Sequence, residues 1–532
     1  MMRTLPTRQH YDFIIVGSGF GGSVSAYRLS QKGYKVLVIE KGKRYTAATF
    51  ARSNWNLRKW IWQPALGLKG IMQVRPLKHV TVMSGVGVGG GSLVYGATLP
   101  TPEPAFFRRG SWAGLEDWEQ VLAPHYQTAR TMLGATQNPD LTSADLVLKD
   151  LAKEMGREQA FGPSTVGIYF GDGERPGKLL EDPFFDGKGP SRAACVQCGR
   201  CMLGCPVNAK NSLDKNYLYL AQKLGAEVMA ETEVVDVRPM GEQTGSQGYF
   251  VLARDKSGLC SRQVTLSTGA VVFSAGVLGT VQLLLKMKVK GALPKLSHCL
   301  GRDIRTNNET ITSVTTSDRS ACYAEGVTIG SILSVDDDSH VEPIVQGVNS
   351  NGWKLLMLPR TSGATFIRRM AGLFASVARK PLTYARMLFA RDWGKRTFSL
   401  LFMQHLDSTL SFNLGRFGRL ASNPQDGPPP GTDIPISNEV TERIEKLVDG
   451  TSFSGATEAI LGTPTTAHIL GGCVMGANSE SGVIDKHNRV YGYQNLYVCD
   501  GSAVSANPGV NPSLSITAMT EWAMSKIPDA TH

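Results

Sequence analysis

The feature that most constrains this sequence is a strand, glycine turn, helix and strand pattern near its beginning. A compact apolar run at residues 11–16 leads into Gly-Ser-Gly-Phe-Gly-Gly at 17–22, and a helical pattern continues to Leu29. A second apolar run, at residues 35–39, ends at Glu40. This order predicts a βαβ unit whose glycines allow a tight turn, close approach of the backbone to a pyrophosphate, and close helix–strand packing. Glu40 is expected to accept a hydrogen bond from a ribose hydroxyl, so the unit indicates dinucleotide binding.

Later segments add strands, helices and a second glycine cluster. The cluster at residues 85–91, followed by Ser92 and Leu93, predicts either close approach of a ligand or a flexible loop. Strands are expected at 228–237, 249–253 and 270–273, the last followed by a helix that ends near Lys286. Residues 496–501 predict a buried strand that ends in a turn. Asn511 and Pro512 predict the start of a helix that runs to about Met524, because proline suits the first helical turn.

Length and hydropathy narrow the class of protein. The chain has 532 residues, of which 42% are hydrophobic, so it can bury a large core in about two to four domains. No stretch reaches the length of about 18 apolar residues that a membrane span needs. The beginning of the sequence is short and polar and lacks the apolar segment of a secretory signal, so we expect a cytoplasmic protein, with peripheral membrane attachment left open.

The net charge of +11 is unevenly distributed. We find no zinc-finger spacing, no basic region with heptads and no RNA-binding aromatic motif, so nucleic acid is not an expected partner. Residues 366–396 combine eight Lys and Arg with apolar and aromatic side chains, and Asp392 is the only acid among them. This pattern predicts an amphipathic surface helix interrupted at Pro381. It fits either a solvated basic face over ordinary core packing, or docking on a membrane or a partner.

Four of the nine cysteines form one short motif. The spacing C-x2-C-x2-C-x3-C-P at Cys195, Cys198, Cys201 and Cys205 matches that of bacterial ferredoxins, so we expect an iron–sulfur cluster of the 4Fe–4S or 3Fe–4S type. Zinc and vestigial thiols are the alternatives. Either Cys205 completes the cluster or three thiolates hold it. The other cysteines, at positions 260, 299, 322, 473 and 499, are expected to be small buried apolar residues.

Several separated blocks together resemble one family. The 17–22 turn with Glu40, the 85–92 cluster, residues 272–276 and the 468–511 block are similar to the glucose-methanol-choline (GMC) flavoprotein oxidoreductases. The segments 87–93, 340–343, 403–407 and 509–512 most resemble the sterol oxidase branch, especially the mycobacterial cholesterol oxidase-like enzymes.

This resemblance implies an α/β fold with two parts. The first is a Rossmann-type FAD-binding domain assembled from the discontinuous segments 11–115, 190–300 and 462–528, with a cysteine-rich insert at 195–206. The second is a substrate-binding α+β domain with an antiparallel sheet, built from 116–189 and 301–461. Because the sequence has no histidine at 92–96, where some members attach the cofactor, FAD is expected to bind non-covalently.

The resemblance also implies three catalytic residues. His468 matches the active-site histidine, whose imidazole can take a hydroxyl proton near working pH, although a buried structural histidine would look the same. Asn511 matches the asparagine beside the flavin in sterol enzymes, with an ordinary helix cap as the alternative. Glu342 matches a carboxylate that shifts a substrate double bond, or is an exposed turn residue before Pro343; His340 is a weaker candidate.

The cofactor-binding residues expected from these motifs lie in seven short groups along the sequence. They are Gly17, Gly19, Phe20, Gly21, Gly22, Glu40, Gly87, Gly89, Gly90, Gly91, Ser92, Val235, Ala275, Gly276, Asp500, Gly501, Asn511 and Pro512.

The expected reaction is oxidation of the hydroxyl of a bulky apolar, sterol-like alcohol by hydride transfer to flavin N5. A cluster would favour a dehydrogenase that passes electrons to a protein or quinone over an oxygen-using oxidase. A long-chain alcohol enzyme, an electron-transfer flavoprotein and a plain NAD dehydrogenase are the alternatives. Trp55, Trp60 and Trp62 are expected to pack in the core or to line a substrate entrance.

Overall fold

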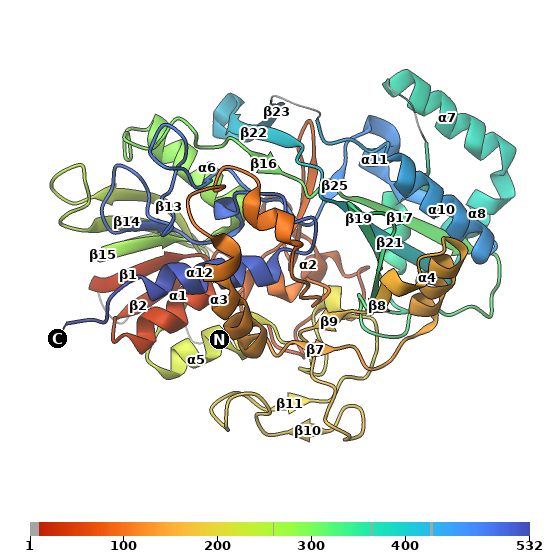
Figure 1. The fold of residues 1–532 in the computed structure, drawn as a ribbon, viewed down its shortest axis with the longest axis horizontal. Coiled ribbons are helices and arrows are strands. Elements are labelled where there is room, and N and C mark those ends of the chain that lie inside the picture. Colours follow the sequence, from red (N-terminus) through yellow and green to blue (C-terminus); the bar gives the residue numbers. More distant parts are fainter. Residues whose placement is uncertain (1–9, 259, 362, 364, 426–428, 532) are drawn as a thin grey trace.

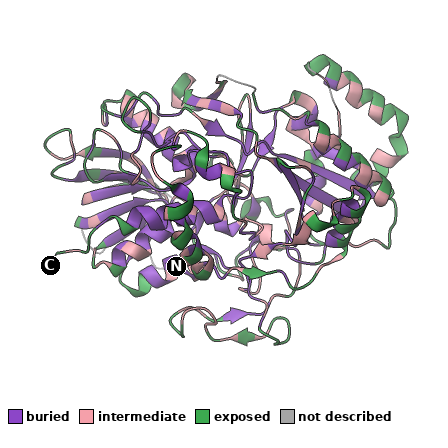
Figure 2. Ribbon diagram, in the orientation of Figure 1, coloured by how far each residue is buried: buried purple, intermediate pink, exposed green. Residues whose placement is uncertain are grey.

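Two large β-sheets, each flanked by helices, organise the protein (Figure 1). The computed structural model describes residues 10–258, 260–361, 363, 365–425 and 429–531. Both sheets are buried, whereas the helices at the far end of the second sheet are largely exposed (Figure 2).

The first sheet is mixed and contains the predicted βαβ unit. Strands β1, β2, β12, β15 and β26 pair in parallel, and β13 and β14 continue the sheet antiparallel. The predicted strand at 228–237 is in fact two strands, β12 and β13, interrupted by Glu231 at positive φ. Along the sheet the order is β12 (Glu227–Met229), β2 (Val36–Ile39), β1 (His10–Val16), β15 (Arg262–Phe273), β14 (Tyr249–Asp255) and β13 (Thr232–Pro239), with β26 (Leu496–Val498) also paired to β15.

Helices cover this first sheet. The glycine turn is followed by α1 (Phe20–Gln31), which packs on α5 (Tyr217–Lys223) and α12 (Ser513–Ser525), while α3 (Trp118–Met132) packs on α12. The predicted helix after residue 275 is α6 (Gly276–Val289). Helix α12 follows Pro512 at its N-cap, close to the predicted start.

The second sheet has seven strands and is antiparallel. Successive side chains on a strand face opposite sides, and the two sides have different partners. On one side Val314, Val341 and Leu400 join a core with the flanking helices. On the other side lie residues of opposite parity, among them Leu401 and Met403. The strand order of this second sheet is β20 (Met357–Pro359), β24 (Gly450–Gly455), β17 (Thr310–Thr316), β21 (Thr397–Gln404), β19 (Ser339–Pro343), β18 (Ser331–Ser334) and β8 (Phe161–Pro163).

Helices cover one face of the second sheet and extend beyond it. Helices α4 (Ser143–Glu154) and α10 (Pro435–Leu447) pack on its strands, and α11 (Ala456–Leu461) contacts α7 (Phe366–Arg379). The segment predicted to be an interrupted amphipathic helix forms α7 (Phe366–Arg379) and α8 (Pro381–Phe389), so the predicted break at Pro381 is confirmed.

The remaining short strands and helices lie outside the two large sheets and the helices described above. They are α2 (Leu57–Trp60), α9 (Trp393–Arg396), β3 (Trp62–Gln63), β4 (Leu68–Lys69), β5 (Met72–Pro76), β6 (Thr81–Gly85), β7 (Thr136–Gln137), β9 (Thr165–Val166), β10 (Leu179–Leu180), β11 (Arg192–Ala193), β16 (Ile304–Arg305), β22 (Thr409–Leu414), β23 (Leu420–Pro424) and β25 (Thr465–Thr466).

The predicted fold class, a Rossmann-type domain plus a domain with a large antiparallel sheet, is confirmed. The domain limits stay a prediction. Within the segment 116–189, α3 packs on α12, whereas α4 packs on strands of the second sheet. Of the scattered cysteines, Cys299, Cys473 and Cys499 are buried as predicted, but Cys260 is exposed and Cys322 half-buried. In the described part of the chain, no helix is both long and apolar enough to cross a membrane.

Candidate active site

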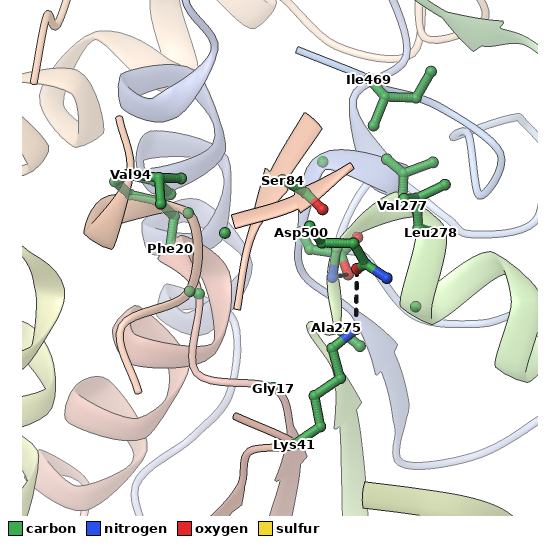
Figure 3. A pocket seen from close by; sticks show the side chains of 18 of the residues that line it. Gly17, Phe20, Lys41, Ser84, Val94, Ala275, Val277, Leu278, Ile469 and Asp500 are labelled. Carbon is green, nitrogen blue, oxygen red and sulfur yellow. Dashed lines mark hydrogen bonds between the residues drawn. The ribbon is translucent and has the colours of Figure 1, made fainter. Parts of the chain in front are cut away.

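One large cavity is lined by the glycine turns of the first sheet and by side chains of the second sheet. Its volume is about 710 Å³, within the range of about 300–1,000 Å³ that small-molecule sites occupy. Figure 3 shows glycine-turn residues, Lys41 and Asp500 around it, with apolar side chains such as Val94 and Ile469 further along its wall. A polar end and an apolar end therefore share one space.

The β1–α1 turn at the polar end depends on glycine for close packing. Gly17 has a φ of +100°. A Cβ atom on Gly21 would lie 1.5 Å from the carbonyl oxygen of Cys499, and one on Gly22 would lie 2.1 Å from that of Gly17. Gly19 differs, because a Cβ there would meet only the Ser274 oxygen at 4.0 Å. Gly21 and Gly22 thus allow the helix and the strands to pack closely. Gly19 instead leaves space in the cavity, because it has no side chain there.

The end of β2 supplies the acid predicted to bind ribose. Glu40 is buried, lines the cavity, and its carboxylate accepts hydrogen bonds from the amide of Ser18 at 3.1 Å, the hydroxyl of Ser18 at 2.8 Å and the amide of Gly42 at 2.8 Å. Helix α1 begins at the cavity, and its N-cap residue, Gly19, provides no side-chain cap. The partial positive charge of the helix end therefore faces the space where a pyrophosphate would bind.

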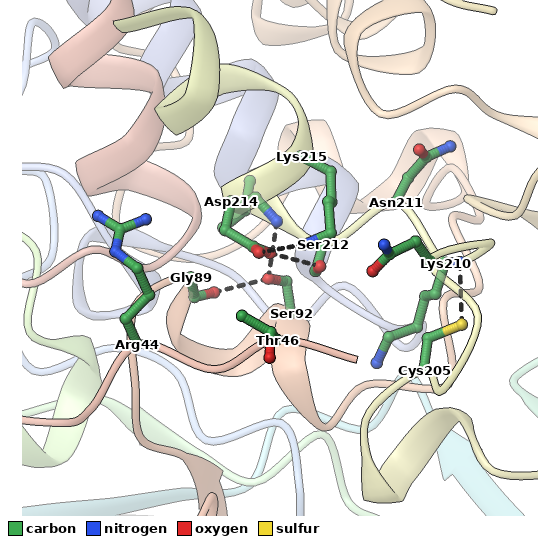
Figure 4. A network of polar contacts seen from close by, with 12 residues as sticks. Arg44, Thr46, Gly89, Ser92, Cys205, Lys210, Asn211, Ser212, Asp214 and Lys215 are labelled. Atoms are coloured by element: carbon green, nitrogen blue, oxygen red, sulfur yellow. Dashed lines mark hydrogen bonds and ion pairs between the residues drawn. The ribbon is translucent and has the colours of Figure 1, made fainter. Parts of the chain in front are cut away.

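The second glycine cluster packs directly onto the first. A Cβ on Gly90 would lie 2.6 Å from the Cα of Gly19, and the amide of Gly89 donates to the hydroxyl of Ser18 at 3.1 Å. Ser92 donates to the Gly89 carbonyl at 2.6 Å and accepts from the Leu213 amide at 3.0 Å (Figure 4). Close packing, rather than a flexible loop, therefore accounts for these glycines.

Most predicted cofactor-binding residues lie in the cavity wall. Those that do not are Gly22, Gly87, Gly89 and Ser92, which pack or hold the two turns. The wall includes Gly17, Gly19, Phe20, Gly21, Glu40, Gly90, Gly91, Val235, Ala275, Gly276, Asp500, Gly501, Asn511 and Pro512.

Asp500 fixes the loop between β26 and α12. Its buried carboxylate accepts hydrogen bonds from the Gly276 amide at 2.9 Å, the Thr280 hydroxyl at 2.5 Å and the Ser502 amide at 2.8 Å. Burial raises the pKa of Asp500, although these hydrogen bonds oppose the rise. The residue thereby ties the start of α6 to the last strand of the first sheet.

At the other end of the cavity, His468 pairs with a glutamate that the sequence did not indicate. His468 follows β25 and lines the cavity, and its Nδ1 atom lies 2.6 Å from Oε2 of Glu309. The side chain of Glu309 is fully buried, and its other oxygen accepts from the Ala467 amide. Burial lowers the pKa of His468, but the Glu309 charge and hydrogen bond outweigh it, so the net shift is upward.

The tautomer of His468 follows from this contact. An ionised carboxylate only accepts hydrogen bonds, so Nδ1 of the ring is the donor. In the neutral ring Nε2 then carries the lone pair and is the nitrogen able to take a proton.

Glu342 and Asn511 meet beside the same cavity. Strand alternation places Glu342 on the side of β19 that faces away from the helices, opposite Leu401, which lines the cavity. Oε2 of Glu342 accepts from Nδ2 of Asn511 at 3.2 Å, and Oε1 lies 3.7 Å from Nε2 of His340. Oε1 of Glu342 and Oδ1 of Asn511 are buried without a hydrogen-bond partner in the described structure. The structure therefore contradicts the alternative of an exposed turn for Glu342, and brings His340 to the pair.

One part of the remaining wall is apolar. The inner face of the second sheet and its loops contribute Ile311, Ile329, Ile344 and Leu401. Methionines line the wall elsewhere, and the three candidate tryptophans are divided: Trp62 lines the cavity, Trp60 is buried against Trp353, and Trp55 is exposed. The apolar end thus suits a hydrophobic substrate, with Met72, Met83, Val94 and Met202 on its wall.

The cysteine motif forms a turn beside the cavity. Its thiols are partly buried, and those of Cys195, Cys201 and Cys205 pack against apolar residues. Sγ of Cys205 accepts from the amides of Ala209 at 3.2 Å and Lys210 at 3.5 Å. Burial raises the pKa of Cys195 to about 12 and raises those of Cys198 and Cys201. Among the described residues, no three His, Cys, Asp or Glu side chains are placed to hold one metal ion. The predicted cluster at Cys195, Cys198, Cys201 and Cys205 is not supported.

Glu309 can be identified as a site residue only from the three-dimensional structure, where it contacts His468. It precedes β17 in the run Thr-Asn-Asn-Glu-Thr at 306–310, where no motif sets it apart. It meets His468 because β17 and β25 come together across 159 residues of chain. His340 was noted from the sequence, but the contact with Glu342 depends on their shared strand face.

Two glycine turns with a buried acid, which open onto a histidine paired with a buried glutamate, are the features expected of a nucleotide-dependent oxidoreductase. Comparison with known proteins narrows this class. The family description "GMC oxidoreductase" matches residues 191–303 and 437–520, and "NAD(P)-binding Rossmann-like domain" matches residues 15–58. The chain belongs to the GMC oxidoreductase family, and the cofactor that this family implies is FAD.

Individual relatives are similar over nearly their whole length. A cholesterol oxidase of Mycobacterium tuberculosis is 44% identical over 533 residues, covering 98% of this chain and 91% of that protein. A cholesterol oxidase of Acinetobacter baumannii is 41% identical over 526 residues, covering 97% and 94%. Among solved structures, pyridoxine 4-oxidase from Mesorbium loti has the same fold, with a TM-score of 0.60 at 15% identity, covering 98% of this chain and 100% of that one.

Proposed function

We propose that this protein oxidises the hydroxyl group of a sterol-like alcohol with FAD as its cofactor. The observation that carries the proposal is the arrangement of one cavity, with a nucleotide cradle at one end and the His468–Glu309 and Glu342–Asn511 pairs beside an apolar wall. The cholesterol oxidase names of two relatives that are 41% and 44% identical support the substrate class.

The residues of the cradle fit the cofactor. The open space at Gly19 and the start of α1, which has no side-chain cap, suit a pyrophosphate. The buried carboxylate of Glu40 suits a ribose. When bound, FAD supplies the ring that accepts a hydride from the alcohol carbon. The start of α12 beside Asn511 directs partial positive charge into the same cavity, where it stabilises negative charge.

The acid–base steps are assigned to side chains of this chain. Nε2 of His468 takes the hydroxyl proton, while Glu309 holds the ring orientation and stabilises the resulting imidazolium. Asn511 positions Glu342, which is placed to move a proton between carbon atoms of the oxidised product and so shift a double bond. An electron-transfer flavoprotein without alcohol chemistry would have no use for this proton acceptor.

For the electron acceptor we propose dioxygen rather than an iron–sulfur relay. Each turnover then converts one alcohol and one dioxygen into one carbonyl compound and one hydrogen peroxide. This replaces the dehydrogenase expected from the cysteine spacing, because the cysteine side chains are not arranged as a metal site and the named relatives are oxidases.

The test compares peroxide release in air with anaerobic turnover by an artificial acceptor, using cholesterol dispersed in detergent. Peroxide formed in a one-to-one ratio with the ketone supports the proposal. Turnover only with the artificial acceptor would overturn the oxidase assignment but keep the alcohol chemistry.

A long-chain alcohol is the second candidate substrate. The flexible methionines Met72, Met83 and Met202 in the wall can adapt to a chain as well as to fused rings. Comparing kcat/KM for cholesterol and for a series of primary alcohols separates the two, since the proposal expects the sterol to be favoured.

A further inference from the structure

Helices α7 and α8 expose a large apolar surface edged by basic residues. Ile367 is 78% and Phe389 is 79% exposed, which is high for side chains of this size. We call this surface the docking face. Its exposed apolar members are Phe366, Ile367, Phe374, Val377, Leu382, Leu388 and Phe389, and its exposed basic members are Arg368, Arg379, Lys380, Arg386 and Arg391.

Helical geometry shows that the docking face points outward. In α8, Met387 is buried in the protein core, whereas Leu382 and Phe389, seven residues apart, share the opposite side. In α7, Arg369 anchors the helix by donating to the carbonyl of Glu458 at 2.9 Å, and Ile367 and Phe374 lie on another side. Figures 1 and 2 show both helices at the far end of the second sheet, largely exposed.

The charge of the docking face is of one sign. No Asp or Glu occurs between Arg360 and Arg391, and Asp392 pairs with Arg396 at 2.9 Å. Exposed aromatic and aliphatic side chains beside Arg and Lys are the combination by which amphipathic helices bind the interface of an anionic bilayer. The long basic side chains can extend to lipid phosphates while the apolar ones enter the acyl region.

The docking face is connected to the substrate cavity. The inner side of α8, at Met387, belongs to the same core cluster as Met83 and Met202, which line the apolar wall. The end of α8 is fixed by Lys354, whose Nζ donates to the carbonyl of Ala390 at 2.7 Å. A membrane under α8 would therefore lie on the side of the molecule where the apolar wall is packed.

We propose that α7 and α8 dock this protein on an anionic lipid bilayer, from which it draws its apolar substrate. The choice of a bilayer as the source of substrate rests on the proposed function. The docking itself rests on the exposed side chains and their charge, so the two can be tested separately.

The experiment measures sedimentation of the purified holoprotein with phosphatidylcholine vesicles, with and without phosphatidylserine, at low and high salt. We expect binding to anionic vesicles that weakens with salt. The double variant Leu382→Asp/Phe389→Asp should lower vesicle affinity by at least about tenfold. The charge-reversed Arg379→Glu/Arg386→Glu should lose the salt-dependent part. Leu179→Asp in β10, an equally exposed leucine at the distant hairpin, should bind like the parent protein.

The outcomes separate docking from catalysis. Failure of the parent protein to bind any vesicle, or equal binding by all variants, would overturn the docking proposal. A change from dimer to monomer in the Leu382→Asp/Phe389→Asp variant would also overturn it, because the face would then be an interface between copies. Turnover of detergent-dispersed cholesterol should be unchanged in the Leu382→Asp/Phe389→Asp variant. If the parent protein binds vesicles but oxidises no sterol, the proposed function is overturned and the docking proposal is not.

Discussion

Oε2 of Glu309 lies 2.6 Å from Nδ1 of His468, although the two residues are 159 positions apart in the chain. The fully buried carboxylate fixes the ring in one tautomer, with Nε2 available in the cavity. It also reverses the effect of burial on the pKa of His468, which rises above its ordinary value. Orientation and basicity of the proposed proton acceptor thus come from one contact.

Replacing His468 with Gln should remove the proton acceptor while keeping the cofactor. We expect kcat for a sterol alcohol to fall by about 10²- to 10⁴-fold, the usual contribution of a general base. Flavin absorbance of the purified variant should match that of the parent protein. His79→Gln is the control, because His79 bonds to Ser422 outside the cavity wall. Full activity in His468→Gln would contradict the assignment.

The pH dependence tests Glu309 as a positioning residue. The base must be neutral to accept a proton, and the pKa of His468 is raised, so kcat/KM should increase with pH through a midpoint above 6.5. Glu309→Gln removes the charge that raises this pKa and leaves the burial that lowers it. The midpoint should therefore move to lower pH, with kcat reduced by at least about tenfold.

The matched control for this shift is Glu458→Gln. Glu458 is buried and accepts from the Thr310 hydroxyl at 3.2 Å, one residue beyond Glu309, but does not line the cavity. An unchanged midpoint in Glu309→Gln, or an equal shift in Glu458→Gln, would show that Glu309 acts only on the fold.

Two neighbouring glycines should behave differently when changed to alanine. Gly21→Ala places a Cβ 1.5 Å from the Cys499 carbonyl, so helix and strand must separate and the thermal unfolding temperature should drop sharply. Gly19→Ala has room within the protein, and its methyl group enters the cavity instead. It should fold normally but bind FAD at least about tenfold more weakly, a loss of about 1.4 kcal/mol. Tight FAD binding by Gly19→Ala would contradict the assignment of the space at Gly19 to FAD.

Oxidation and the double-bond shift should be separable at Glu342. In the proposed mechanism its carboxylate moves the carbon-bound proton, while His468 takes the hydroxyl proton. Glu342→Gln should still consume alcohol but release the ketone with its double bond in the original position. Ultraviolet absorbance of the conjugated ketone measures this. Formation of the conjugated product at the parent rate would assign that step elsewhere.

Local patterns predicted much of the fold because they depend on neighbouring residues. The glycine turn into α1, the break at Pro381 and the start of α12 after Pro512 follow from backbone preferences. The position of Glu342 beside the cavity could be found only from the alternation of β19 and its pairing with β21. Glu309 was missed because only the meeting of β17 with β25 gives it a partner.

The cysteine motif shows the opposite case. Its spacing matches that of ferredoxins, but the ligand positions depend on how the turn packs. Here buried Lys210 donates to the carbonyls of Cys201 and Leu93, and the turn fills the space beside Tyr95 with apolar contacts. The spacing alone could not show that the thiols pack against apolar residues instead of pointing toward one metal site.

The most direct test of the central claim is an absorbance spectrum of the purified protein, recorded without oxygen before and after addition of a sterol alcohol. Flavin bands that bleach on addition, and that do not bleach in His468→Gln, are the predicted result. A protein with no flavin bands, or with flavin bands that no sterol alcohol bleaches, would contradict the account.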